Sequence, residues 1–395
     1  MLVAGIISEY NPFHLGHAAL IEQTRQAGAT HIAAVMSGNF VQRGEPAMLS
    51  KWARTRQALA NGVDLVIELP LPWAIAGAEK FALGGVSLTD ALGADRLSFG
   101  SECGSAEELQ KAAAALTSPL LREELQSELN RGITFARARQ NAVEHLYGAE
   151  TALLLAQPNN TLGIEYMKAL HKLGSSAEPF TIRRVGAAHD AQDDIEQIAS
   201  ASRIRRAAAN GEDFTGLMPS SSALIFRQEM ENGSAPASLQ RMEPAVLAKL
   251  RCMSKDEFAA LPDISEGLEN RLYSAVRGAT SLEEVFALTK SKRYTLARIR
   301  RIVLSAFLGV TADMSRGAPP YLRVLGLNAN GAQILRRAKS IKKLPIISHS
   351  SDLLLLDKPA ENMLELENRT TDLYALCMPK PGPCGLDKTT GIATV

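Results

Sequence analysis

Short apolar runs separated by amphipathic stretches dominate the first hundred residues. Near-continuous apolar strands that alternate with helices are typical of a parallel sheet covered on both faces. The pattern therefore predicts an α/β fold in this part of the chain. The predicted strands are residues 2–7, 31–36, 63–69 and 96–99, and the predicted helices are residues 18–27, 50–61 and 72–92.

The alternation weakens after residue 100. A charged helical excursion is predicted at about 105–150, and helical segments dominate from about residue 215 to 310. We therefore expect two domains, residues 1–212 and a mainly helical α+β domain at 213–395, with a loose tail from Pro379. The further predicted elements are a helix at 158–173 and strands at 179–184, 321–327 and 345–347.

A polar turn with two histidines follows the first predicted strand. Residues 9–17 read EYNPFHLGH, and a helix is predicted directly after them. A helix N-terminus carries roughly +0.5 charge and unpaired N–H groups, and imidazoles can donate hydrogen bonds to phosphate. Histidines at this spacing are often only capping or surface residues. In open parallel sheets, however, ligands bind beyond the carboxyl ends of strands, so the position favours a phosphate site at His14 and His17.

A second polar motif, IASASRIR at residues 198–205, opens a predicted helix. The chain has no GxxxxGK[ST] loop and no GxGxxG after its first strand, so it is not predicted to be a P-loop or dinucleotide-binding protein. The two motifs together fit attack at the α-phosphate of ATP with pyrophosphate leaving. His14 and His17 would donate to the α-phosphoryl and leaving oxygens, and Ser200, Ser202 and Arg205 would hold the β- and γ-phosphates.

Overall composition excludes few classes of protein. The net charge is +1, and 46% apolar with 22% charged residues is ordinary for a soluble globular protein. The N-terminus has no basic region or cleavage site, and the longest aliphatic runs are too short to span a bilayer, so we expect a cytoplasmic protein without a membrane segment. Cys103, Cys252, Cys377 and Cys384 form no CxxC pair and are expected to be reduced thiols, without a metal or disulfide role.

Charge is concentrated between Lys290 and Lys343. This stretch has thirteen Lys or Arg residues and one acid, Asp313, so its local net charge is about +12. A basic helix face is often only a solvated face, but two clusters in one domain favour a polyanion surface. The candidate RNA-binding residues here are Lys290, Lys292, Arg293, Arg298, Arg301, Arg336 and Arg337.

The strand–HxGH–helix start and the later IASASRIR are similar to the HIGH-motif nucleotidyltransferase superfamily, although Ala201 and Ser202 stand where many members have Ser and Thr. A closer resemblance, to the bacterial tRNA(Met) cytidine acetate ligase family, covers much of the chain. The matching strings, in order, are GIISEYNPFHLGH, VMSGNFVQRGEPAMLSKWARTRQAL, GVDLVIELP, FGSE, PNNTLGIEY, IASASRIR, KRYTLARIRR and YLRVLGLNANG.

This resemblance implies a Rossmann-like nucleotidyltransferase domain followed by a tRNA-binding domain. It implies that acetate and ATP form acetyl-adenylate and pyrophosphate, and that the wobble cytidine of elongator tRNA(Met) then becomes N4-acetylcytidine as AMP leaves. Acetate is already an anion at pH 7 and needs no base, and Mg²⁺ is expected from the chemistry of ATP. The oligomeric state is not indicated by the sequence.

The resemblance also implies ATP contacts, residue by residue. Asn159 could equally be a helix cap and Gly100 a simple turn glycine. Arg183 and Arg184 point to opposite faces of an extended strand, and we favour Arg184 for ATP. The implied positions are Ile7, Ser8, Glu9, Tyr10, Asn11, Pro12, Phe13, Leu15, Gly16, Leu20, Gly100, Asn159, Arg184 and Val185.

The polar loop after the second strand leaves two interpretations open. Arg43 and Lys51 could contact phosphate or tRNA, because this loop is expected at the ligand edge of the sheet, or they could pair with Glu45 at the surface. Two other functions also remain possible at this stage: an adenylyltransferase for a small phosphate metabolite, which gives no role to the basic region, and a non-catalytic tRNA-binding protein, which does not require both histidines.

Overall fold

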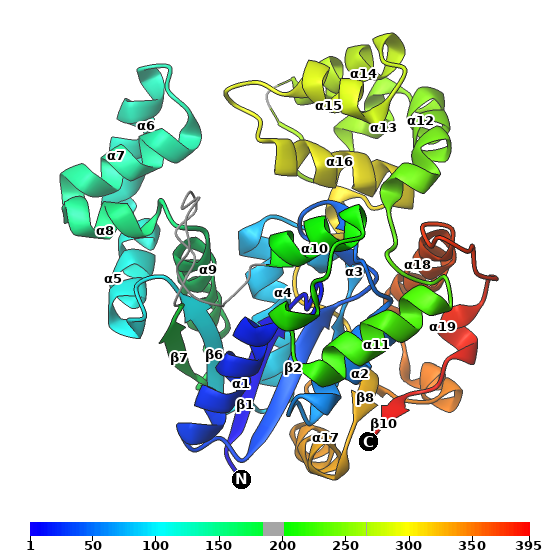
Figure 1. Ribbon diagram of the computed structural model, residues 1–395. Coiled ribbons are helices and arrows are strands. Elements are labelled where there is room, and N and C mark those ends of the chain that lie inside the picture. The colour runs from blue at the N-terminus through cyan, green and yellow to red at the C-terminus, as the bar shows by residue number, and fades with distance from the viewer. Residues whose placement is uncertain (185–200, 266) are drawn as a thin grey trace.

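A mostly parallel sheet of eight strands forms the centre of the computed structural model, which describes residues 1–184, 201–265 and 267–395 (Figure 1). The strand order is β10-β8-β5-β2-β1-β6-β7, and β9 pairs with β8. The strands are β1 (Val3–Ser8), β2 (His31–Ser37), β5 (Leu65–Leu69), β6 (Arg96–Ser101), β7 (Glu178–Arg183), β8 (Leu322–Leu327), β9 (Ile346–Ile347) and β10 (Ala393–Thr394).

The predicted strands and the parallel sheet are confirmed, with one antiparallel junction. β1 pairs in parallel with β2 on one side and with β6 on the other, whereas β5 and β8 run antiparallel. Strands β2 and β5 are buried along their whole length, as expected for strands with helices on both faces. The sheet is thus a mixed sheet in which β8, β9 and β10 form a second parallel group.

Helices cover both faces of the sheet. The α1 and α2 side chains Ile21 and Leu59 pack with Ile32 on one face, while α4 and α9 pack on the other with Phe81 and Ile164. Among the described residues, no helix is both long and apolar enough to cross a bilayer. These helices are α1 (Leu15–Gln26), α2 (Lys51–Ala60), α3 (Leu71–Ala74), α4 (Ala78–Ala91) and α9 (Pro158–Leu173).

The polar loop expected after β2 contains a short hairpin. Strands β3 (Phe40–Val41) and β4 (Glu45–Pro46) pair antiparallel. Arg54 of α2 is fully buried beneath this hairpin. Its guanidinium satisfies backbone oxygens that would otherwise be buried without a partner, namely those of Leu49, Glu9, Ser37 and Gly38.

The predicted helical excursion is present and lies at the left of Figure 1. It consists of α5 (Ala106–Thr117), α6 (Pro119–Asn130), α7 (Phe135–Tyr147) and α8 (Ala149–Leu154). The later α-helices are α10 (Ala201–Asn210), α11 (Ser220–Glu231), α12 (Glu243–Cys252), α13 (Lys255–Ala259), α14 (Leu268–Gly278), α15 (Leu282–Thr289), α16 (Leu296–Leu308), α17 (Ala329–Ile341), α18 (Lys358–Ala375) and α19 (Leu386–Thr389). Short 3-10 helices are η1 (Thr215–Leu217), η2 (Leu239–Met242), η3 (Ala312–Ser315) and η4 (Ser350–Leu355).

The second half of the chain contributes strands to the sheet of the first. β8 pairs with β5, and β10 pairs with β8. The predicted domain boundary between residues 212 and 213 stays a prediction. Strands from both sides of this boundary belong to the same sheet. The expectation of a loose tail is wrong, because Asp387 of α19 is buried and ion-paired with Lys51 and Arg323.

Candidate functional site

The two histidines of the first motif form a stacked pair at the start of α1. His14 is the N-cap, and its Nδ1 accepts a hydrogen bond from the Gly16 amide at 3.0 Å. His17 Nδ1 accepts in turn from the His14 amide at 3.2 Å, and the ring centroids are 3.8 Å apart. Because each Nδ1 is an acceptor, this bonding pattern assigns the proton of each neutral ring to Nε2. The pair therefore carries two N–H donors for a ligand.

Both imidazoles are neutral near pH 7. Burial, followed by the charges of Arg184 and Arg205, lowers the pKa of His14 to about 3. The pKa of His17 is also well below its ordinary value, through burial first and then through His14 and Arg184. The histidines consequently act as neutral donors, while the positive charge at the site comes from the two arginines.

Several residues of the turn support the histidines with side chains that face the interior. The ring centroids of Tyr10 and Phe13 lie 4.9 Å and 5.4 Å from that of His17. The side chains of Tyr10, Phe13 and Ile7 are buried. The ATP contacts predicted for these residues would therefore involve their backbone atoms. Asn11 Oδ1 accepts from the Met48 amide at 2.8 Å, which ties the turn to the loop before α2.

The remaining predicted residues of this turn differ in how far they are buried. Ser8 Oγ accepts a hydrogen bond from the Tyr10 amide at 3.3 Å. Leu15, Gly16 and Leu20 on α1 are half-buried, whereas Pro12 is buried. The turn is therefore held mainly by its own backbone and aromatic side chains.

The second motif meets the first although they are about 190 residues apart in sequence. Arg205 of α10 donates from Nη1 to the Asn11 carbonyl at 2.8 Å and from Nη2 to Ser202 Oγ at 3.0 Å. Its Nε lies 3.6 Å from Glu45 Oε1. The structure thus brings Ser202 and Arg205 to the histidine turn. Ser200 and Val185 lie outside the described residues.

Gly100, Asn159 and Arg184 also come together, from the ends of β6 and β7 and the start of α9. Arg184 Nη1 donates to Asn159 Oδ1 at 3.3 Å. A Cβ on Gly100 would lie 3.1 Å from Arg184 Cγ, so this glycine allows the arginine to pass close to the backbone. Arg183 instead packs against Gly104. The two arginines therefore diverge as predicted, and Arg184 is the one beside the histidines.

Glu102 organises this second wall and was not predicted as a site residue. Its Oε1 accepts from Asn159 Nδ2 at 2.7 Å, and its Oε2 accepts from the Asn160 amide at 2.6 Å. A carboxylate at a helix N-terminus satisfies otherwise unpaired N–H groups. The sequence signal is the FGSE string directly after a predicted strand.

A cluster of two carboxyl groups and two arginines lies beside the histidines. Glu9 directly follows β1, and its Oε1 accepts from the Gln42 amide at 2.7 Å. Burial raises the pKa of Glu9, the nearby Glu45 raises it further, and the Gln42 hydrogen bond, Arg43 and Arg205 oppose these effects. Arg43 is exposed at the tip of the β3–β4 hairpin. The tip therefore presents a positive charge next to the site.

The prediction that Lys51 contacts RNA is wrong. Lys51 is fully buried, and its Nζ lies 2.8 Å from Glu68 Oε1 and 2.6 Å from Asp387 Oδ1. A buried ammonium needs such partners because its desolvation is costly. Lys51 therefore joins β5 to the C-terminal α19. The alternative pairing with Glu45 does not occur either.

The first basic cluster lies near the histidine edge of the sheet. Helix α16 packs against the β3–β4 hairpin, where a Cβ on Gly44 would come within 2.6 Å of the α16 backbone at Arg300. Arg298 and Arg301 are anchored to Asp263, through its carbonyl at 2.7 Å and its carboxylate at 3.1 Å. The predicted RNA-binding residues that are exposed here are Lys290, Lys292 and Arg293.

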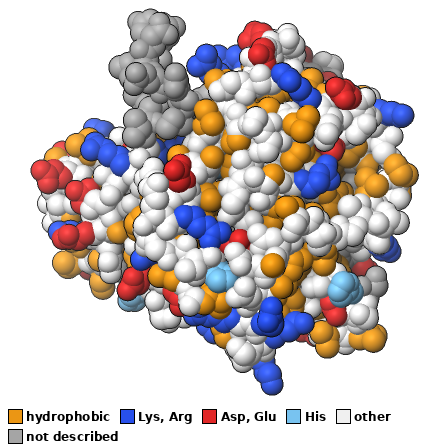
Figure 2. Space-filling model, turned by 60° about the horizontal axis from the view of Figure 1, so that its bottom comes forward, with side chains coloured by type: hydrophobic (Ala, Val, Ile, Leu, Met, Phe, Trp, Pro, Cys, Tyr) orange, Lys and Arg blue, Asp and Glu red, His pale blue; other side chains and the backbone are white. Residues whose placement is uncertain are grey.

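The second basic cluster lies at the opposite edge. Arg337 of α17 makes a bidentate pair with Asp95, which precedes β6, at 2.6 Å and 2.8 Å. Arg336 is exposed. Helix α17 thus lies at the lower edge of Figure 1, and Figure 2 shows Lys and Arg side chains scattered over that face. The two clusters therefore lie on different parts of the molecule, and polyanion binding by either cluster stays a prediction.

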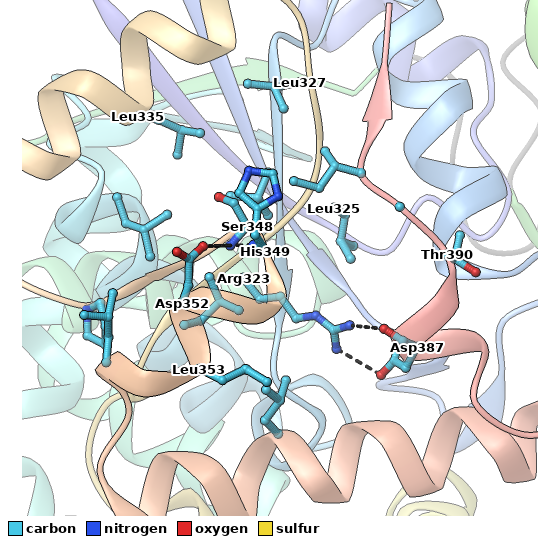
Figure 3. A pocket seen from close by; sticks show the side chains of 18 of the residues that line it. Arg323, Leu325, Leu327, Leu335, Ser348, His349, Asp352, Leu353, Asp387 and Thr390 are labelled. Carbon is cyan, nitrogen blue, oxygen red and sulfur yellow. Dashed lines mark hydrogen bonds and ion pairs between the residues drawn. The ribbon is translucent and has the colours of Figure 1, made fainter.

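A hollow of about 1480 Å³ lies away from the histidines, among β8, β9, η4 and β10. Leu325, Leu327 and Leu335 contribute apolar walls (Figure 3). Two of its charged lining residues are paired with each other, because Arg323 Nη1 donates to Asp387 Oδ2 at 2.9 Å. This hollow is therefore separate from the predicted site.

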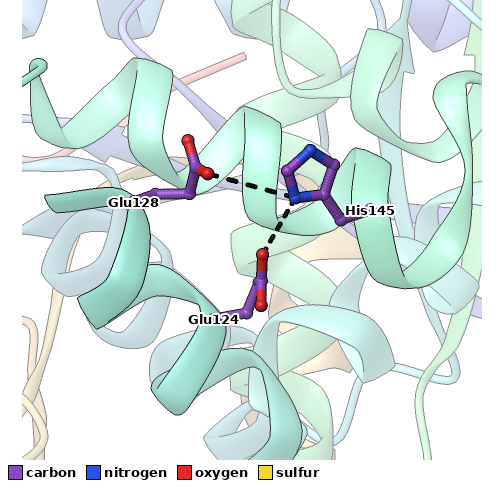
Figure 4. Close-up of side chains that lie close together, drawn as sticks. All are labelled: Glu124, Glu128 and His145. Atoms are coloured by element: carbon purple, nitrogen blue, oxygen red, sulfur yellow. Dashed lines mark hydrogen bonds and ion pairs between the residues drawn. The ribbon is translucent and has the colours of Figure 1, made fainter. Parts of the chain in front are cut away.

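One side-chain group in the excursion has the composition of a metal site, but its atoms are committed to one another (Figure 4). His145 Nδ1 lies 2.9 Å from Glu124 Oε1. The two Glu128 oxygens accept from Arg131 at 2.6 Å and from Asn141 at 2.7 Å. These contacts join α6 to α7 and account for the close approach of the three side chains.

Comparisons with known proteins cover nearly the whole chain. The family model described as HIGH Nucleotidyl Transferase matches residues 1–385. A protein of Acetivibrio thermocellus named tRNA(Met) cytidine acetate ligase is 38% identical, with 96% of each chain covered. One of a Thermoanaerobacter species with the same name is 40% identical, with 98% of each covered. The crystal structure of Thermotoga maritima TmcAL bound with alpha-thio ATP superposes with a TM-score of 0.93 at 32% identity, over 100% of both chains.

Proposed function

This chain belongs to the tRNA(Met) cytidine acetate ligase family of HIGH nucleotidyl transferases, and we propose that it is the ATP-dependent ligase that forms N4-acetylcytidine at the wobble position of elongator tRNA(Met). The observation that carries this proposal is the pair of neutral histidines with two Nε2–H donors, facing Arg184 and Arg205. Donors and fixed positive charge are what an adenylation step requires.

In the first half-reaction, an acetate oxygen attacks the α-phosphorus of ATP and pyrophosphate leaves. Acetate is already an anion, so the enzyme supplies position and charge stabilisation rather than a base. His14 and His17 would donate to the α-phosphoryl and leaving oxygens. Ser202 and Arg205 would hold the β- and γ-phosphates, and Asn159 and Arg184 would form the opposite wall.

In the second half-reaction, the cytidine amine attacks the acetyl carbon and AMP leaves. An anticodon loop presents unstacked bases that a protein site can take in. Arg43 lies on the β3–β4 hairpin, and the exposed Lys290 and Lys292 precede α16, which packs against that hairpin; all three would contact phosphates of the tRNA. Mg²⁺ would enter with ATP, held by phosphate oxygens and water. A tRNA substrate places the enzyme in the cytoplasm.

The experiment that tests this function is mass spectrometry of tRNA(Met) after incubation with ATP and isotopically labelled acetate. The expected product is one labelled acetyl group on the wobble cytidine, together with AMP and pyrophosphate. Acetate-dependent ATP–pyrophosphate exchange without tRNA would demonstrate the first half-reaction separately. If neither exchange nor labelled tRNA appears, the proposal fails. If the protein instead adenylylates a small phosphate metabolite, and its tRNA binding does not depend on salt, the adenylyltransferase alternative would be favoured.

A further inference from the structure

Transfer of the acetyl group to cytidine releases a proton that the histidines are poorly placed to accept. The cytidine N4 amine carries two hydrogens and must lose one when it becomes an amide. The Nδ1 atoms of His14 and His17 are occupied by backbone N–H donors. Their pKa values are far below the ordinary range, which opposes protonation of either ring. The second half-reaction therefore calls for another acceptor.

Of three other carboxylates near this edge of the sheet, two already have strong partners. Glu102 accepts from the side chain of Asn159 and from backbone N–H groups at the start of α9. Glu68 is buried against Lys51 and Arg323. The third, Glu45, has only the Arg205 guanidinium 3.6 Å from its Oε1, which accepts no hydrogen bond from a described residue, and it therefore serves as the control below. The oxygens of Glu102 and Glu68 are thus already committed to hydrogen bonds or ion pairs within the protein.

Glu9 differs from these three carboxylates in its contacts. Its Oε1 is fixed by the Gln42 amide at 2.7 Å, while its Oε2 makes no hydrogen bond to any described residue. Its carbonyl is held by Arg54 Nη1 at 2.7 Å. The side chain is therefore anchored at both the backbone and one oxygen, and the second oxygen remains available. Glu9 also directly follows β1, at the strand end where a ligand of this sheet binds.

We propose that Glu9 is the general base for acetyl transfer to cytidine, an inference that rests on the proposed function. The N4 nitrogen forms a bond to the acetyl carbonyl carbon, and the bond from that carbon to the AMP phosphate oxygen breaks. The bonding electrons leave with AMP, and one N4 proton passes to Glu9 Oε2. Glu9 later returns this proton to solvent. Adenylation does not use this base, because acetate attacks as an anion.

The surroundings of Glu9 suit this assignment. Burial and Glu45 raise its pKa, which makes its carboxylate a better proton acceptor than an exposed one. The arginines keep the carboxylate ionised at neutral pH by opposing these two effects. The charged and titratable groups that face Glu9 are Arg43 and Glu45 on the hairpin, Arg54 on α2, Tyr166 on α9 and Arg205 on α10.

The test uses the full chain with Glu9→Gln and measures both half-reactions. Single-turnover acetyl transfer to tRNA should fall by about 10²- to 10⁴-fold, the usual contribution of a general base. Acetate-dependent ATP–pyrophosphate exchange should fall by at least about tenfold less than transfer, because that step needs no base. The wild-type transfer rate should decline as pH drops through the pKa of Glu9, and Glu9→Gln should lose this decline. Glu9→Asp should restore part of the transfer rate.

Glu45→Gln is the matched control, because it removes the neighbouring carboxyl and should keep the acidic decline in transfer rate. Thermal melting of each variant separates loss of folding from loss of chemistry. If exchange and transfer fall equally in Glu9→Gln, or if Glu45→Gln is the variant that loses the acidic decline, Glu9 is not the base. If the wild-type protein itself shows neither exchange nor transfer, it is the proposed function that fails.

Discussion

His14 and His17 each serve two purposes through the two nitrogens of one ring. The Nδ1 atoms accept the N–H groups of the N-cap His14 and of Gly16 in the first turn of α1, and the Nε2 atoms remain as donors. A helix cap and a phosphate donor are thus combined in the same side chain. This combination explains why capping and function could not be separated by sequence spacing alone.

Replacing His14 by Asn should separate these two purposes. The Asn side-chain oxygen can still accept from the Gly16 amide, so we expect stability to change by no more than about 1 kcal/mol. The variant lacks the Nε2–H donor, and acetate-dependent exchange should fall by about 10²- to 10³-fold. His171→Asn, at the exposed end of α9, is the control. Unchanged exchange in His14→Asn would contradict the donor assignment.

Glu367 of α18 makes stability depend on pH. It is fully buried, its Oε1 accepts from the Leu71 amide at 2.5 Å, and it lies near Glu68. Burial, followed by the Glu68 charge, raises the pKa of Glu367 to about 8. The folded protein therefore retains a proton that the unfolded chain releases near pH 4.5. The resulting stabilisation is fully present below that pH and is lost as pH rises through about 8.

Glu367→Gln mimics the protonated side chain and should remove this loss. We expect the wild-type free energy of unfolding to fall between about pH 5 and 8, by up to about 1.4 kcal/mol per pH unit from this group. The curve of Glu367→Gln should be flatter over the same window. Glu365→Gln, which changes an exposed carboxyl on the same helix, should follow the wild type. Urea unfolding at several pH values measures all three.

At the scale of elements, the position of a helix decides what its basic residues can do. α16 packs on the β3–β4 hairpin beside the histidine edge, whereas α17 lies near Asp64 and Asp95, before β5 and β6. Parallel strands place their carboxyl ends at one edge of a sheet. Only the cluster around α16 therefore lies on the side where a tRNA base would enter.

This arrangement predicts different effects of two double variants on tRNA binding. Lys290→Ala with Lys292→Ala should weaken binding and reduce the slope of log affinity against log salt by about 0.9 for each phosphate that is no longer neutralised. Arg336→Ala with Lys339→Ala removes the same charge from α17 and should leave the slope close to that of the wild type. Equal changes in both double variants would mean that the tRNA also spans the lower edge.

At the scale of the whole molecule, the C-terminus completes the sheet and its buried charges. β10 pairs with β8, and Asp387 shares Lys51 and Arg323 with Glu68. These charges lie far apart in sequence but are buried together. Removing one member leaves the others without a counter-charge in a region shielded from water.

Deletion of residues 386–395 should therefore destabilise the protein by about 3–5 kcal/mol, the usual cost of breaking a buried ion pair. Asp387→Asn should account for much of this loss, because it leaves Lys51 and Arg323 with less negative charge nearby. Lys388→Ala, at an exposed neighbour in the same helix, should change stability by less than about 0.5 kcal/mol. If the unfolding curve of the deletion variant matches that of the wild type, residues 386–395 contribute nothing to stability.

The sequence by itself determined the features that depend on local pattern. Alternating apolar runs and helical stretches predicted the parallel strands β1, β2, β5 and β6, because burial on both faces demands continuous apolar residues. The HxGH and IASASRIR motifs indicated nucleotide chemistry from residue types alone. The opposite directions of Arg183 and Arg184 followed from strand geometry and agree with the structure.

Only the tertiary structure decided where charged residues lie. Lys51 resembled a surface lysine because Glu68 and Asp387, which offset the cost of its burial, are distant in sequence. The separation of the two basic clusters and the antiparallel pairing of β8 with β5 also depend on contacts between residues that are distant in sequence. A charge is stable inside a protein only when its partners are also there, and such long-range pairing leaves no periodic signal in the chain.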